Sequence, residues 1–122
     1  MDLFSLKVSG SSKLIIKHPA TGADTDCVIE LCGKDSTQFR DAYGELIKSV
    51  VGKDHDQIDF AAIDAKAYAA CTVSWENLEE NGKAIECTPE NILNIYTNPD
   101  YKWLHEQVVQ FVGSRENFMQ PS

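Results

Sequence analysis

The chain has 122 residues and a formal net charge of −8, from 19 acidic and 11 basic side chains. The length fits one domain, and 43% hydrophobic with 25% charged residues is the composition of an ordinary soluble globular protein. The negative balance argues against a nucleic-acid-binding protein, which needs a basic face for phosphates, and against docking on an anionic membrane. We therefore expect neither nucleic acid nor a membrane as a partner.

The acidic residues are concentrated in one third of the chain. Residues 54–90 hold nine acidic and two basic side chains, a balance of −7, whereas the other 85 residues together carry −1. This distribution is typical of a solvated face that keeps a protein soluble. The alternative is an acidic docking surface for a basic partner, in which charge would set the association rate and the choice of partner.

The first part of the chain has the pattern of a β-hairpin. Residues 13–18 are rich in β-branched side chains and predict a strand, and the proline and glycine within residues 19–24 predict a turn. Residues 25–32 alternate in hydrophobicity, as expected of a second strand that ends at Gly33. The same alternation predicts a third strand around Phe4, Leu6 and Val8.

The hydrophobic period then changes from 2 to 3.6 residues, which predicts helices. In the first helix we expect Asp35 to be the N-cap, with Gln38 completing a capping box, and Gly52 to mark the end. This helix has one apolar stripe, formed by Phe39, Tyr43, Leu46, Ile47 and Val50. A second, alanine-rich helix is expected over residues 57–73, followed by Trp75 as a core side chain.

Two more helices begin with a polar residue followed by proline. Asn81 and Gly82 predict a tight turn. Thr88 precedes one proline and Asn98 precedes another, and both pairs are typical of a helix N-cap and first helical position. The last helix is expected to end near Gly113 and carries an apolar stripe of Leu104, Val108, Phe111 and Val112.

These elements predict a single α+β domain over residues 1–122 that is predominantly helical. It consists of a β-rich N-terminal segment with a β-hairpin (1–33), about four α-helices (34–113) and a loose tail (114–122). No secretory signal and no apolar run long enough for a membrane helix is recognisable, so we expect a cytoplasmic protein. In that compartment the cysteines, Cys27, Cys32, Cys71 and Cys87, are expected to be reduced thiols.

The residue patterns that catalysis or metal binding require are missing from the sequence. The cysteines and the three histidines, His18, His55 and His105, do not have the paired spacing of zinc ligands. Residues 51–62 look like a calcium loop but lack its first carboxylate, its glycine and its final glutamate. There is no nucleophile elbow and no glycine-rich phosphate loop. We therefore predict that the protein is not an enzyme and has no cofactor, no metal and no catalytic residue.

A cluster of large apolar side chains near the C-terminus is the candidate protein-binding site. The last helix can present an apolar face, and a loose tail would not be part of the core. The predicted binding residues are Trp103, Phe111, Phe118 and Met119. The alternative interpretation is that the helix residues belong to the core and the tail is unpacked.

Residues 73–83 (VSWENLEENGK) and 87–91 (CTPEN) together resemble a pattern in small tail assembly chaperones of long-tailed bacteriophages. There a helix ends in a tryptophan, a glycine–lysine turn follows, and a threonine caps the next helix. The turn at residues 19–22, the segment 35–40 and the aromatic residue within 116–118 are also similar. The resemblance covers most of the chain and depends on the order and spacing of these motifs.

The resemblance implies a non-enzymatic role. Such chaperones bind the long, aggregation-prone tape measure protein, keep it soluble and help to recruit tail tube subunits. They act in the cytoplasm of the infected bacterium and are absent from the finished virion. A structural phage tail component or a general acidic protein-interaction module is the alternative function. The sequence leaves self-association open, so a homo-oligomer is one of the states to test.

Overall fold

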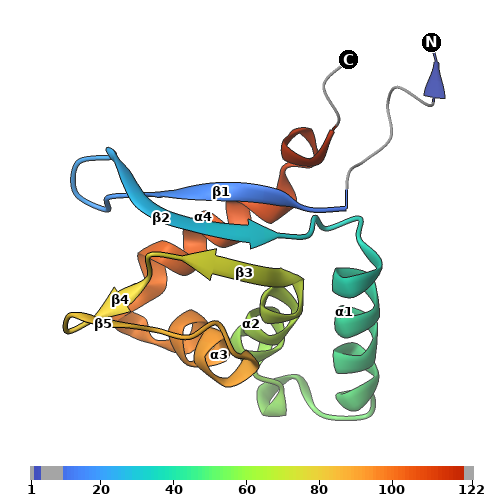
Figure 1. Cartoon of the computed structure of the whole chain (residues 1–122). Helices are drawn as coiled ribbons and strands as arrows, with labels where there is room; N and C mark the ends of the chain where they lie inside the picture. Colours follow the sequence, from blue (N-terminus) through green and yellow to red (C-terminus); the bar gives the residue numbers. More distant parts are fainter. Residues whose placement is uncertain (1, 4–9, 120–122) are drawn as a thin grey trace.

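A three-stranded antiparallel sheet with the order β1-β2-β3 forms one layer of the fold (Figure 1). The computed structural model describes residues 2–3 and 10–119. Strands β1 (Ser12–Lys17) and β2 (Asp24–Leu31) make the predicted hairpin, and β3 (Thr72–Glu76) pairs with the other edge of β2. Leu14 lies opposite Ile29, which in turn lies opposite Trp75, so one face of the sheet is apolar across all three strands.

Four α-helices complete the described part of the chain, which confirms the α+β class and the predicted number of helices. Helix accounts for 50% and strand for 22%, so helix is the larger share. The α-helices are α1 (Thr37–Ser49), α2 (Phe60–Cys71), α3 (Pro89–Thr97) and α4 (Lys102–Gly113). Short elements join them: the 3-10 turns η2 (His55–Gln57), η3 (Pro99–Tyr101) and η4 (Arg115–Phe118), and the hairpin of β4 (Glu79–Glu80) with β5 (Lys83–Ala84).

The core lies between the apolar face of the sheet and the helices. Helix α4 runs behind β1 and β2, and α1 stands at one end of the sheet beside α2 (Figure 1). The most completely buried side chains come from both layers: Ile16, Ile29, Leu31, Cys71, Val108, Val112 and Phe118. No polar or charged residue is buried in the part of the chain that the structure describes. Burial of apolar area is therefore the main stabilising contribution of this core.

The third strand of the sheet is not where the sequence places it. Residues 72 and 73 were expected in the second helix, but α2 ends at Cys71 and the chain continues directly into β3. Pairing with β2 decides this, because backbone hydrogen bonds to a strand far away in sequence outweigh a local helical pattern. The strand expected around Phe4, Leu6 and Val8 lies outside the described residues. Trp75 is 9% exposed, as expected of a core side chain, and its Nε1 donates a hydrogen bond of 2.8 Å to the Ile85 carbonyl oxygen.

The N-cap of α1 is Ser36, so the predicted capping box with Asp35 is wrong. The Ser36 hydroxyl accepts a hydrogen bond of 3.2 Å from the Phe39 amide. Asp35 instead pairs with Arg115, eighty residues later in the chain. Asp35 is engaged by the Arg115 guanidinium and does not cap the helix, and the adjacent Ser36 can supply the cap equally well.

The turn at Asn81 and the cap at Thr88 are confirmed, whereas the expected cap of the last helix, Asn98, belongs to a separate 3-10 turn. Asn81 and Gly82 both have positive φ, 54° and 79°, as a two-residue hairpin turn requires, and they join β4 to β5. The Thr88 hydroxyl accepts a hydrogen bond from the Asn91 amide and caps α3, with a proline at the first helical position. Asn98 caps η3, so α4 itself begins only at Lys102.

The two ends of the α1–α2 segment meet beside the sheet. The Cys32 amide, just after β2, donates a hydrogen bond of 2.8 Å to the carbonyl oxygen of Cys71, the last residue of α2. Between these residues the chain leaves the sheet, forms the two packed helices and returns as β3. The α1–α2 pair is thus an insertion between β2 and β3 whose first and last residues are joined by this hydrogen bond.

Candidate functional site

The four predicted binding residues do not form one exposed surface. Phe118 is 1% exposed, and Trp103, Phe111 and Met119 are half-buried. Trp103 and Phe111 pack against the hydrophobic core. The Phe111 and Phe118 rings meet edge to face, with centroids 5.4 Å apart. Contact of these residues with a partner stays a prediction, but most of their aromatic surface packs against other residues of the same chain.

The described part of the tail, residues 114–119, is not loose as expected, and we call it the C-terminal clip. The Phe118 ring packs closely against Gly33, where an added Cβ would come within 2.9 Å of the ring atom Cδ2. Arg115 Nε and Nη2 donate hydrogen bonds of 2.6 and 3.1 Å to the two carboxylate oxygens of Asp35. This pair holds the pKa of Asp35 below its ordinary value and raises the pKa of Arg115. The clip therefore fastens the end of α4 to the β2–α1 connection.

The apolar surface that sequence reasoning missed lies on α1. This helix buries none of its residues. The inner edge of its stripe, Phe39, Leu46 and Val50, is half-buried beside α2, while Tyr43 and Ile47 are 38% and 36% exposed. Val51, in the turn that follows α1, is 76% exposed. We call Tyr43, Ile47 and Val51 the α1 face.

Aromatic contacts join the α1 face to the core. The Phe39 ring stacks on Tyr43 at 5.8 Å and meets Tyr68 of α2 at 5.3 Å. Tyr68 in turn contacts the ring of His105 on α4, edge to face, at 5.7 Å. The path from an exposed tyrosine to the packed helices is continuous, so α1 is held in place although it buries no residue completely. The apolar stripe was recognisable in the sequence, but the sequence did not indicate which of its side chains stay exposed.

His105 is the least satisfied polar side chain in the described core. Its ring contacts Tyr68 and also Tyr96, and its Nδ1 atom is buried with no hydrogen-bond partner among the described residues. Burial lowers the pKa of His105, so the neutral ring is favoured. A hollow of about 540 Å³ opens beside it, lined by residues that include Asp64 and Tyr96. A neutral imidazole among aromatic rings is a packing group in this setting.

The thiols are held in their protonated form. Burial raises the pKa of Cys27 to about 11 and that of Cys71 to about 12, and it also raises the pKa values of Cys32 and Cys87. A thiol with such a pKa is a weak nucleophile and a weak metal ligand at neutral pH. Within residues 2–3 and 10–119, no group of three histidine, cysteine or acidic side chains could hold a metal ion. No helix described there is both long and apolar enough to cross a bilayer.

The acidic third of the chain is spread over the surface. All nine of its acidic side chains are exposed, and they extend from the loop before α2 to the first turn of α3. Glu80 accepts a hydrogen bond from the Tyr101 hydroxyl. Full exposure agrees with the interpretation of a solvated face, and contact of this region with a partner stays untested.

Comparisons with known proteins give no relative on which to base a function. No protein-family model matches the chain, and no match was found among curated proteins or among solved structures. The function must therefore be argued from the surfaces described above and from the motifs in the sequence.

Proposed function

We propose that the protein is a non-catalytic tail assembly chaperone of a long-tailed bacteriophage. It binds the tape measure protein and keeps it soluble, and it helps to recruit tail tube subunits. It acts in the cytoplasm of the infected bacterium and leaves the tail before the virion is complete. The ordered motifs between Val73 and Asn91 support this proposal, together with the α1 face.

The motifs that carry the resemblance form one structural unit. Trp75 of β3 holds the strand after the turn through its hydrogen bond to Ile85, and Thr88 then caps α3. These residues are consequently used for folding. Their side chains are engaged in contacts within the chain, so we assign partner binding to another surface.

The α1 face is the observation that favours a binding role. A 13-residue helix with no buried residue and a row of exposed apolar side chains is unusual for a chain whose other helices each bury three or four. Exposed apolar rows of this kind bind apolar helices of a partner. The net charge of −8 would keep a complex with an aggregation-prone partner dispersed.

Co-expression with the tape measure protein of the same phage tests the proposal. We expect the soluble fraction of the tape measure protein to rise when this chain is present, and to fall again with Ile47→Glu, which places a charge in the α1 face. Val73→Glu is the matched control, since Val73 is 52% exposed and belongs to β3, not to the α1 face.

An unchanged soluble fraction of the tape measure protein with the wild-type chain would refute the chaperone role. If Ile47→Glu and Val73→Glu behave alike, the α1 face is not the binding surface. Mass spectrometry of purified particles separates the alternative function, because a structural tail component would be retained in the virion and a chaperone would not.

A further inference from the structure

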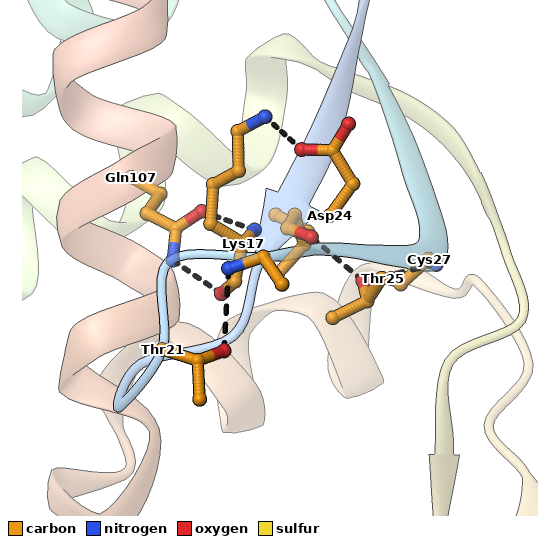
Figure 2. Close-up of polar contacts among 8 residues, drawn as sticks. Lys17, Thr21, Asp24, Thr25, Cys27 and Gln107 are labelled. Carbon is orange, nitrogen blue, oxygen red and sulfur yellow. Dashed lines mark hydrogen bonds and ion pairs between the residues drawn. The ribbon is translucent and has the colours of Figure 1, made fainter.

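Among the described residues, no strand lies beside the outer edge of β1. Strand order in the sheet is β1-β2-β3, so β1 pairs on one side only. Successive residues of a strand direct their N–H and C=O groups to opposite edges. Lys17 directs both groups outward, as its hydrogen bonds to Gln107 of α4 show (Figure 2), and Lys13 and Ile15 have the same parity. Four backbone groups of Lys13 and Ile15 therefore point to this edge, where no described strand pairs with them.

The Gln107 side chain makes the hydrogen bonds to this edge that a neighbouring strand would make. Its side-chain oxygen accepts a hydrogen bond of 2.8 Å from the Lys17 amide, and its Nε2 donates one of 2.9 Å to the Lys17 carbonyl oxygen (Figure 2). One side-chain amide thus reproduces the donor and acceptor of a peptide group. It occupies the edge at Lys17, and no described strand pairs with the stretch from Lys17 back to Ser12.

A groove runs along this stretch between β1 and α4. It is a hollow of about 270 Å³ with apolar and polar walls, in which Lys17 is the charged residue. Leu14 and Phe111 supply apolar surface, and both are half-buried. The rest of its lining comes from Ile15, Lys17, Gln107, Gln110, Ser114 and Asn117. An edge strand beside a helix with an apolar floor is the geometry that accepts an added peptide strand.

The charges at this edge indicate what kind of strand fits. In a chain of net charge −8, the charged side chains of β1 are both lysines, Lys13 and Lys17, and they point away from α4 on the exposed face. Lys17 is paired with Asp24 on β2, whereas Lys13 lies opposite Glu30 in the register. A strand on the outer edge would meet the lysines directly, and acidic side chains opposite them would be stabilising.

The same charges argue against a second copy of this chain. If two β1 strands paired antiparallel around Ile15, Lys13 of each would lie directly opposite Lys17 of the other. Like charges in opposed positions destabilise a strand pair, and lysine on an edge strand is a common defence against self-pairing. A partner with a different charge pattern is required.

We propose that the outer edge of β1 binds an extended segment of another protein by strand addition. The segment alternates apolar residues, which face Leu14 and Phe111, with acidic residues, which face Lys13 and Lys17. Backbone hydrogen bonds to Lys13 and Ile15 hold it, and Gln107 sets where it ends. This surface shares no residue with the α1 face, so the inference stands or falls independently of the chaperone role.

Titration of the ¹⁵N-labelled full chain with a nine-residue peptide of alternating valine and glutamate, blocked at both ends, tests the proposal. We expect shifts and slowed hydrogen exchange at the Lys13 and Ile15 amides. A peptide with lysine in place of glutamate should not bind, and affinity should fall as salt is raised. The mapping uses the wild-type protein, so it does not depend on any variant folding.

Two variants separate strand addition from general attraction. Ile15→Pro removes one outward N–H, a change that edge strands tolerate, and should weaken binding about tenfold. Lys13→Glu should weaken it about as much by reversing one charge, whereas Lys53→Glu, the same change in the loop after α1, should have less than about a twofold effect.

Three results would overturn the inference. The first is no shift at the β1 amides, which would mean that the lysines only protect the edge. The second is undiminished binding to Ile15→Pro. The third is a wild-type dimer in sedimentation that Ile15→Pro dissociates, since a second copy would then occupy the edge.

Discussion

Truncating Phe118 tests whether the C-terminal clip is part of the core. The ring is 1% exposed and packs on Gly33 and Phe111. Phe118→Ala removes this buried surface and leaves a cavity, which costs about 3–5 kcal/mol in well-packed cores. We expect a loss near the lower figure, because the clip can detach and the remaining core can stay folded.

The corresponding thermal shift follows from the length of the chain. At about 2.1 cal/mol/K per residue, unfolding 122 residues has an entropy of about 260 cal/mol/K, so a loss of 3 kcal/mol lowers Tm by about 12 °C. Urea unfolding followed by tryptophan fluorescence gives the free energy, and calorimetry gives Tm. Phe60→Ala is the control, since the same truncation at a side chain that is 44% exposed should cost clearly less. A loss below about 1 kcal/mol for Phe118→Ala would show that the tail is loose after all.

Gly33 provides a second, independent test of the same contact. A Cβ at this position would lie 2.9 Å from Phe118 Cδ2 and 3.0 Å from Cγ, so Gly33→Ala should force the ring outward at a cost of about 1–3 kcal/mol. In the double variant with Phe118→Ala the methyl group has room. The double variant should therefore lose less stability than the sum of the losses in the two single variants. Strict additivity of the two losses would refute the packing of Phe118 on Gly33.

Three further predictions concern single groups. Burial lowers the pKa of His105 below the value of 6.5 in the unfolded chain, so its stabilising contribution is complete above pH 6.5 and is lost as the pH falls below 6.5. The free energy of unfolding, measured in urea at pH 7.5 and 5.5, should therefore change less in His105→Phe than in the wild type. An equal change in the two proteins would contradict the prediction. Thr88→Ala should cost about 1 kcal/mol through loss of the α3 cap, and Thr88→Ser should recover most of it. In the folded protein a thiol reagent should modify Cys87 faster than the three buried cysteines, and all four should react alike in urea; equal rates before unfolding would show that the buried thiols are accessible.

Local signals in the sequence predicted most of the elements. The β1–β2 hairpin, the tight turn at Asn81, the Thr88 cap and the end of α4 at Gly113 all depend on neighbouring residues, and the structure has each of them. These features depend on turn chemistry and periodicity, which a short window of sequence contains.

The errors concern contacts between residues that are far apart in the chain. Strand β3 is defined by pairing with β2, more than forty residues earlier, and no pattern within residues 72–76 shows that partner. Phe118 is buried against Gly33, and Asp35, the expected cap of α1, is paired with Arg115. The exposure of the candidate binding residues could not be predicted for the same reason, because the packing of distant elements decides which aromatic side chains stay at the surface.

The hydrogen bond between Cys32 and Cys71 has a practical consequence for labelling the protein. Because this hydrogen bond joins the two ends of the α1–α2 insertion, the sheet does not constrain the length of the loop between α1 and α2 around Gly52. Doubling a flexible loop costs only about 0.6 kcal/mol in closure entropy. An epitope or a small fluorescent domain inserted after Gly52, which has a φ of 86° in an exposed turn, should be tolerated by the fold and would label the protein without a terminal tag.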